Sequence, residues 1–114
     1  MKLQGTPRQV GDITIVDLSG RITLGDGSAT LREMLRDLTR AGQLKVILNL
    51  EDVDYIDSSG IGELVSAFTT SRAGNGELKL LNLTRRVHDL LQITKLYTVF
   101  DIYSDERTAL AGFR

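Results

Sequence analysis

Residues 44–62 read LKVILNLEDVDYIDSSGIG and contain the signals that decide the fold. Residues 46–50 are aliphatic except for Asn49, and such a nearly continuous apolar run is typical of a strand that is covered on both faces. The acidic residues 51–54 follow and are expected to form a turn. After Asp57-Ser58-Ser59-Gly60 the apolar residues recur at helical spacing, which predicts an amphipathic helix. The stretch therefore predicts a buried strand, a turn and a helix.

The segments on either side repeat this alternation of strands and helices. Two strand candidates flank Gly11-Asp12 and predict an opening hairpin, and the glycine-rich residues 20–27 are expected to end its second strand. Asp26 or Ser28 is the expected cap of the next helix, and Gly42 its expected stop. Taken in order, the predicted elements are strands over 3–10 and 13–19, a helix around 31–38, a strand over 44–50, a helix around 61–68, a strand over 78–83, a helix around 87–94, a strand over 99–103 and a helix over 105–113.

Strands that alternate with helices in this way predict an α/β fold. We expect a mixed sheet in which the opening hairpin is antiparallel and the remaining strands are largely parallel, with about four helices and right-handed crossovers. A chain of 114 residues is long enough for one hydrophobic core and too short for two. Residues 1–114 are therefore expected to form one domain.

Composition excludes several classes of function. A net charge of −1 provides no broad positive field for nucleic acid or an anionic membrane. The sequence has no cysteine and one histidine, so thiolate sites and multi-histidine metal sites within one chain are excluded. No signal core or membrane-length apolar run is present, which predicts a cytoplasmic protein. We expect no metal and no cofactor.

The motif Asp57-Ser58-Ser59-Gly60 lies at a predicted helix start, where unpaired backbone N–H groups and the helix dipole attract oxygen atoms. A phosphate on a serine at this place would add about −1.5 to −2 charges without requiring the helix to unfold. Gly60 and Gly62 cost helix stability, which indicates that something approaches the backbone closely. The alternative is that Asp57 or Ser58 only caps the helix and the glycines belong to a tight turn. Both interpretations are compatible with the motif alone.

Other polar residues have simpler explanations. His88 has no second histidine and no nucleophile pattern near it, so we expect a partly exposed polar residue. Arg85 and Arg86 begin a helix and are either solvated or retained for an acidic partner. The acidic residues around the motif, Glu51 and its neighbours, lack calcium-loop spacing and are expected to be solvated.

Beyond these local patterns, the chain resembles the anti-sigma factor antagonists, the bacterial anti-anti-sigma members of the STAS domain family. The resemblance extends over nearly the whole chain, and the DSSG stretch after a buried strand is its most specific motif. The segments that carry it are LSGRI at 18–22, VILNL at 46–50, VDYIDSSGIG at 53–62, LLNL at 80–83 and FDIY at 100–103.

The resemblance implies that Ser58 is phosphorylated by a partner that is both an anti-sigma factor and a serine kinase. Asp57, Ser59 and Gly60 would then shape the phosphoacceptor loop. The unphosphorylated protein would bind that partner and release sigma factor, and the phosphorylated protein would not. ATP would belong to the kinase, and a phosphatase would act on phosphorylated Ser58. The implied protein is a phosphoprotein of bacterial signalling that regulates transcription without catalysis of its own.

The expected partner surface combines small and polar residues. An exposed stripe beside the motif holds Gly62, Glu63 and Ser66. Many members of the family also carry an acidic residue where this chain has Thr23, and Asp26 is the candidate to replace that charge near the partner.

Two other classes of function stay open at this point. An enzyme would use Ser58 as a nucleophile, but the sequence has no GxSxG elbow and only one distant histidine as a base. A non-switching STAS scaffold, or a subunit of a stressosome-like or lipid-transport assembly, would have the same fold and would use Ser58 for packing or docking.

Overall fold

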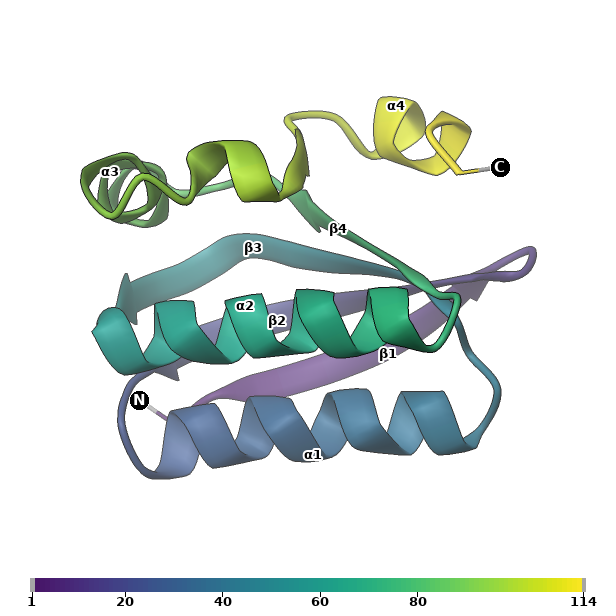
Figure 1. Ribbon diagram of the computed structural model, residues 1–114, viewed down its shortest axis with the longest axis horizontal. Helices are drawn as coiled ribbons and strands as arrows, with labels where there is room; N and C mark the ends of the chain where they lie inside the picture. The colour runs from purple at the N-terminus through teal and green to yellow at the C-terminus, as the bar shows by residue number, and fades with distance from the viewer. Residues whose placement is uncertain (1, 114) are drawn as a thin grey trace.

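The computed structural model describes residues 2–113, in which five strands form one sheet in the order β1-β2-β3-β4-β5 (Figure 1). The predicted order of strands and helices is confirmed. The elements are β1 (Gln4–Val10), β2 (Ile13–Ile22), α1 (Asp26–Arg40), β3 (Lys45–Ile56), α2 (Ser58–Ala73), β4 (Glu77–Leu81), α3 (Arg85–Ile93), a 3₁₀ turn (Tyr97–Val99), β5 (Asp101–Tyr103) and α4 (Glu106–Ala111).

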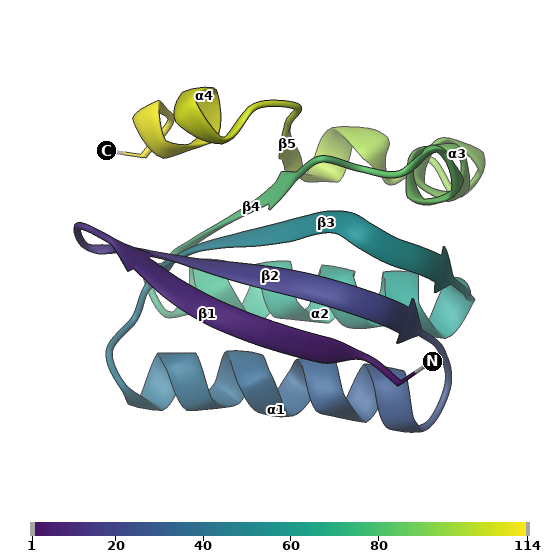
Figure 2. The same cartoon turned by 180° about the vertical axis from the view of Figure 1, so that it is seen from behind.

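The pairing of the strands confirms the predicted mixed sheet. The hairpin β1–β2 is antiparallel, whereas β2–β3, β3–β4 and β4–β5 are parallel. Figure 2 shows the long hairpin at one side of the sheet and the short β5 at the other. Because β2 and β3 run in parallel, the loops after them, which lead into α1 and α2, meet at the same edge of the sheet.

The central strand β3 is buried on both of its faces, as its aliphatic run predicts. Val46 and Leu48 pack into a large core with residues of α1, α2 and α3. Ile47 points the other way, into a smaller cluster that includes Ala109 of α4. Covering both faces removes the aliphatic side chains of residues 46–50 from water.

The expected acidic turn at residues 51–54 is wrong, because β3 continues through it to Ile56. Val53 and Ile56 are fully buried, while the acidic side chains beside them are exposed. The parallel pairing of β2 with β3 shifts register twice, between Asp17 and Ser19 and between Gly20 and Arg21. These irregularities interrupt the simple alternation of inward and outward residues. Among residues 2–113 no group of three or more acidic or histidine side chains is arranged to hold a metal ion.

Three element boundaries also differ from expectation. Strand β2 runs through Gly20 to Ile22 and does not end in the glycine-rich segment. Helix α1 is capped neither by Asp26 nor by Ser28: its N-cap is Gly25, at φ 94°, without a side-chain hydrogen bond. The expected last strand over 99–103 is shortened to residues 101–103 by the preceding 3₁₀ turn. The predicted stop is confirmed, since α1 ends at Arg40 and Gly42 has φ 78°.

Candidate functional site

Asp57 connects the two loops at the carboxyl edge of the sheet. It is the N-cap of α2, and its Oδ1 accepts a hydrogen bond from the backbone N–H of Gly60 at 2.9 Å. Its Oδ2 accepts from the backbone N–H of Leu24, in the loop between β2 and α1, at 3.1 Å. Its own backbone N–H donates to the carbonyl of Ile22 at 3.3 Å. The expected cap is thus confirmed at Asp57, and it also holds the neighbouring loop.

These contacts fix the charge of the Asp57 carboxyl group. Burial pushes its pKa upward, but hydrogen bonds from the backbone N–H groups of Gly60, Leu24 and Ser59 together lower the pKa below its ordinary value. Asp57 is therefore ionised near neutral pH. Both of its oxygens accept hydrogen bonds from the backbone, so this carboxylate is a structural anchor.

Ser58 is the first residue of α2 and its side chain is exposed. Ser59 follows half-buried in the same turn. The helix that they begin is 16 residues long and has no acidic residue in its first turn. A negative group on Ser58 would therefore lie at a positive helix end whose charge is offset so far by the Asp57 carboxylate alone.

The two glycines of the motif have different surroundings. A Cβ atom on Gly60 would lie 2.6 Å from Cγ1 of Ile56 and would also collide with the backbone carbonyl of Ile22. A Cβ atom on Gly62 would meet nothing within 4 Å. The close approach that the sequence indicated is thus internal at Gly60, where α2 packs on β2, and open to solvent at Gly62.

The loop between β2 and α1 lies directly beside the motif. Thr23 is half-buried, and its carbonyl accepts hydrogen bonds from both the backbone N–H and the hydroxyl of Ser28 at 3.0 Å each. Asp26 is exposed at the start of α1. Between them, Leu24 leaves 80% of its surface exposed, the largest exposure of any large hydrophobic residue among those described. An apolar side chain at this place is available to a partner that docks on the motif.

Glu63 and Ser66 extend the surface along α2. Glu63 is held by Arg32 of α1, whose Nη2 lies 2.8 Å from the carboxylate Oε1. Ser66 is exposed four residues after Gly62, about one helical turn further along α2. The structure therefore places Thr23, Leu24 and the motif together, while Glu63 and Ser66 also face the space between α1 and α2.

A stack of two arginines on one tyrosine lies at the same edge of the sheet. The guanidinium carbon of Arg86 lies 3.9 Å from the ring centroid of Tyr55, and that of Arg21 lies 4.9 Å from it. Neither arginine makes an ion pair within residues 2–113. Cation–π contacts hold both charges in place without neutralising them. The site thus presents two positive charges without an ion-pair partner, stacked on Tyr55, which lies two residues before Asp57 in the chain.

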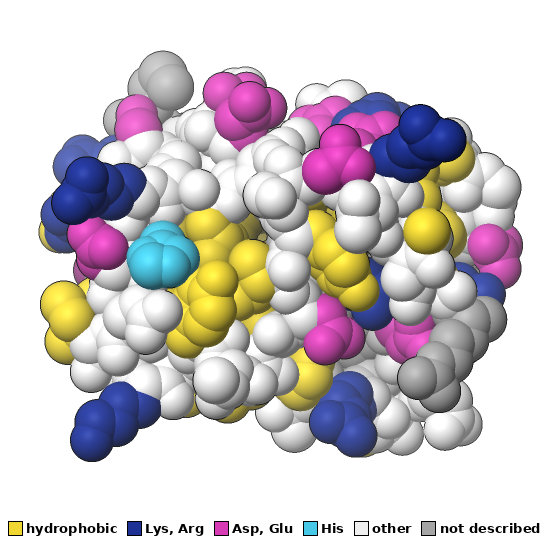
Figure 3. All heavy atoms as spheres, turned by 90° about the horizontal axis from the view of Figure 1, so that it is seen from above, with side chains coloured by type: hydrophobic (Ala, Val, Ile, Leu, Met, Phe, Trp, Pro, Cys, Tyr) yellow, Lys and Arg dark blue, Asp and Glu magenta, His cyan; other side chains and the backbone are white. Residues whose placement is uncertain are grey.

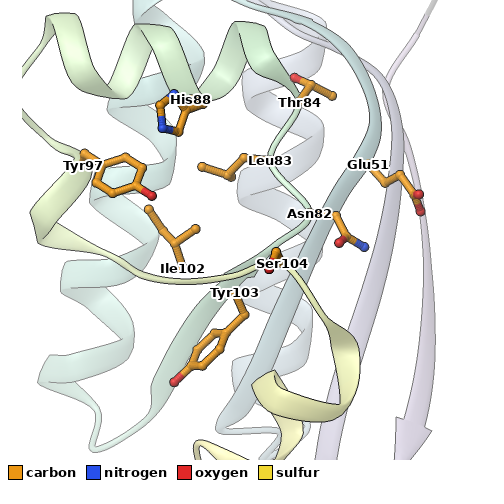
Figure 4. Close-up of a pocket in the computed structure, with 9 residues that line it drawn as sticks. All are labelled: Glu51, Asn82, Leu83, Thr84, His88, Tyr97, Ile102, Tyr103 and Ser104. Carbon is orange, nitrogen blue, oxygen red and sulfur yellow. The ribbon is translucent and has the colours of Figure 1, made fainter.

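His88 lines a separate hollow of about 510 Å³ between α3 and the segment around β5 (Figure 4). Its ring packs edge-on against Tyr97, with centroids 5.0 Å apart. Leu83 and Ile102 supply apolar surface between these rings and Tyr103. Figure 3 shows the histidine beside this apolar patch. Its side chain is partly exposed, as the sequence indicated.

Sequence reasoning missed Leu24 and Tyr55 as members of the site. Leu24 had no signal beyond being an apolar residue in a glycine-rich loop. The clue to the stack was that Arg21 and Tyr55 end neighbouring parallel strands, where they are register partners. Arg86 was expected to be solvated or to face an acidic partner, and the structure adds its contact with Tyr55.

Comparison with known proteins places this geometry in a family. The STAS domain family matches residues 6–109. The anti-sigma-B factor antagonist of Bacillus subtilis is 38% identical over 88 residues, which are 76% of this chain and 78% of that protein. The anti-sigma F factor antagonist of Paenibacillus polymyxa is 26% identical over 110 residues, 96% of this chain and 94% of that protein.

Solved structures share the fold. The Bacillus cell fate determinant SpoIIAA in its phosphorylated form superimposes with a TM-score of 0.74 at 20% identity, over 97% of this chain and 100% of that one. None of the helices within residues 2–113 combines the length and apolar character that crossing a bilayer requires.

Proposed function

Because the chain belongs to the STAS domain family, with relatives that are anti-sigma factor antagonists, we propose that it is itself an anti-sigma factor antagonist. Its unphosphorylated form binds a cytoplasmic anti-sigma factor that has serine kinase activity, and this binding releases a sigma factor. Phosphorylation of Ser58 by that partner ends the interaction, and a phosphatase restores it.

The observation that carries the proposal is the placement of Ser58. Its side chain is exposed at the first position of α2, while Asp57 and Gly60 on either side are held by backbone hydrogen bonds and by packing. A protein kinase can reach such a hydroxyl without unfolding the loop around it. A protein of the same fold, SpoIIAA of Bacillus, exists in a phosphorylated form.

The helix end explains how a phosphate can be tolerated by the fold. A phosphate on Ser58 adds about −1.5 to −2 charges at the N-terminus of a 16-residue helix, where negative charge is favourable by about 0.3–1 kcal/mol per unit. The modification therefore changes the surface and leaves the fold intact. A partner surface that closes over the neutral hydroxyl would have to desolvate the phosphate, which costs several kcal/mol unless it is paired.

The catalytic groups for the transfer must come from the partner. The carboxylate of Asp57, next to Ser58, already accepts hydrogen bonds from Gly60 and Leu24. We therefore assign this carboxylate a structural role and assign the general base to the partner. This chain is the substrate of the kinase and contributes no catalysis.

The partner-binding surface consists of the open face around the motif. Gly62 is exposed, and the space that a Cβ atom would occupy is open to 4 Å, so a partner backbone can approach closely there. Leu24, in the loop that carries Thr23 and Asp26, provides the apolar contact, and Ser66 extends the surface along α2. Glu63 belongs to the same surface, and its carboxylate is held in place by the ion pair with Arg32.

The test compares Ser58→Ala with Ser58→Asp as baits in a lysate of the host, with Ser104→Asp as a matched control at another exposed serine. We expect the alanine and control baits to capture a protein with a kinase-type ATPase domain, and the aspartate bait to lose it. Mass spectrometry of the native protein should find phosphate on Ser58. Equal capture by Ser58→Ala and Ser58→Asp would contradict the switch and support a non-switching scaffold or an assembly subunit.

A further inference from the structure

A groove of about 290 Å³ lies between α1 and α2, and its floor is apolar. Leu35 and Ala67 line the two helical walls, while Val46 and Leu78, at the amino ends of β3 and β4, form the bottom. This volume lies just below the range for small-molecule sites, which is about 300–1,000 Å³. The apolar floor is surrounded by a charged and polar rim. The groove can take one short apolar chain.

Three arginines follow one wall of the groove at four-residue spacing, so they lie on one face of α1. Arg32 is paired with Glu63, the acidic residue that lines the opposite wall. Arg40 has Asp37 at 3.9 Å, at the limit of an ion pair. Arg36 makes no ion pair within residues 2–113. The groove therefore combines an apolar floor with one uncompensated guanidinium at its rim.

We propose that this groove binds a medium-chain fatty acid, with the alkyl chain on the floor and the carboxylate on Arg36. A guanidinium group offers two parallel N–H donors whose spacing matches the two oxygens of a carboxylate. One unpaired arginine matches a single negative charge, which favours a carboxylate over a doubly charged phosphate. The hydroxyl groups of Ser66 and Thr70, on the facing helix, add donors at the same rim.

This site is distinct from the proposed phosphoacceptor loop. It lies between the middle and carboxyl-terminal parts of α1 and α2, whereas Ser58 begins α2 at the opposite end of that helix. Only Glu63 and Ser66 belong to both surfaces. A failure of the fatty-acid proposal therefore leaves the switch at Ser58 untouched, and the reverse also holds.

The first experiment titrates the ¹⁵N-labelled protein with decanoate and follows the amide signals of α1 and α2 by NMR. We expect saturable shifts confined to residues around the groove. Substitution Arg36→Gln should weaken binding about tenfold or more, as expected for loss of a charge-assisted pair. The matched control is Arg107→Gln, an exposed arginine on α4 that does not line the groove, and it should leave the affinity unchanged.

Two analogues test the chemistry of the headgroup. Neutral 1-decanol should bind at least tenfold more weakly than decanoate, since it cannot pair with Arg36. Decyl phosphate should not exceed decanoate. Equal binding of the alcohol would overturn the role of charge, and tighter binding of the phosphate would overturn the assignment of a carboxylate.

A second pair of variants tests the location. Thr70→Trp adds a large side chain at the rim and should abolish decanoate binding, whereas Thr69→Trp, at the neighbouring exposed position outside the groove, should preserve it. Dispersed NMR spectra of both variants establish that they fold. Equal effects of the two tryptophans, or the absence of saturable shifts in the unsubstituted protein, would refute the proposal.

Discussion

Asp57 joins two loops through one carboxylate. Replacing it first by asparagine and then by alanine separates the contributions of its two backbone hydrogen bonds to the free energy of unfolding. Asn is a good N-cap, so Asp57→Asn can keep the hydrogen bond from Gly60 through its amide oxygen. The amide nitrogen cannot accept from the backbone N–H of Leu24, so the link to the β2–α1 loop is lost. Asp57→Ala loses both hydrogen bonds. The two variants should therefore differ in stability.

The expected magnitudes follow from these contacts. Loss of a side-chain N-cap costs about 1 kcal/mol, and loss of a hydrogen bond to a charged group costs about 1.5–3 kcal/mol when the site is well shielded. Asp57 is only half-buried, so we take the lower end for the link to Leu24. The free energy of unfolding should fall by about 1–1.5 kcal/mol in Asp57→Asn and by about 2–3 kcal/mol in Asp57→Ala.

Urea unfolding followed by far-UV circular dichroism measures these differences, and the slope m should stay constant. The control is Asp105→Ala, which removes the cap that accepts from the backbone N–H of Thr108 without touching a second loop, and it should lower the free energy of unfolding by less than Asp57→Ala does. Native-state hydrogen exchange should speed up at the amide of Leu24 in both Asp57 variants. An Asp57→Asn variant as stable as the unsubstituted protein would refute the two-loop role, because it would show that the hydrogen bond from Leu24 contributes nothing.

The pH dependence provides an independent check on the same carboxylate. The pKa of Asp57 in the folded protein is lower than its ordinary value of about 3.9. A depressed folded pKa means that the charged group stabilises the fold fully above the unfolded pKa, and that this stability is lost as pH falls through the folded pKa. The difference in stability between the unsubstituted protein and Asp57→Asn should therefore narrow below about pH 4. A constant gap down to pH 2 would contradict the ionised anchor.

The remaining predictions concern the surface around the motif. Gly60→Ala should destabilise the fold by about 1–3 kcal/mol because its Cβ collides with β2, whereas Gly62→Ala should stabilise the fold by about 0.5–1 kcal/mol. In thermal unfolding the midpoint should therefore fall in the first variant and rise in the second, and shifts in the same direction would contradict the different surroundings of the two glycines. Arg86→Gln should slow association with the isolated kinase partner and flatten its salt dependence in stopped-flow measurements, and its neighbour Arg85→Gln, which makes no aromatic contact among the described residues, should change neither. Leu24→Ala should weaken partner binding in calorimetry by about 1–2 kcal/mol while the free energy of unfolding stays within about 0.5 kcal/mol, and a matching loss of stability would assign Leu24 to the fold.

The sequence predicts the sheet well where one physical cause dominates. Residues 46–50 are aliphatic except for Asn49 because β3 has cores on both sides, with Leu48 in one and Ile47 in the other. The prediction failed at 51–54 because acidic residues favour a turn locally, whereas here they are the outward side chains of a strand. The inward residues Val53 and Ile56 are three apart, a spacing that neither strand nor turn patterns predict and that the irregular pairing with β2 produces.

The site was predictable where the contacts are local in sequence. Residue type limited the cap of α2 to Asp57 or Ser58, and the structure assigns it to Asp57, which accepts from Gly60 three residues on. Its second hydrogen bond reaches Leu24, 33 residues away, and depends on the parallel pairing of β2 with β3. Long-range pairing also explains why the arginines on Tyr55 come from two different elements.

In the motif, the residues that stabilise the fold differ from the residue that is exposed to a partner. Asp57 and Gly60 face inward, and their hydrogen bonds and packing would not be broken by a phosphate on the exposed side chain of Ser58. Negative charge at the start of α2 is favourable for the helix, whereas a partner that must bury the serine would have to desolvate a phosphate there. Phosphorylation would therefore favour the folded protein and disfavour the complex. A switch of this kind needs no second conformation of the protein. Under the proposed switch, the energy difference would arise in the complex, where a phosphate on Ser58 would lose water, and the open face around Gly62 lies in the same first turns of α2 as that serine.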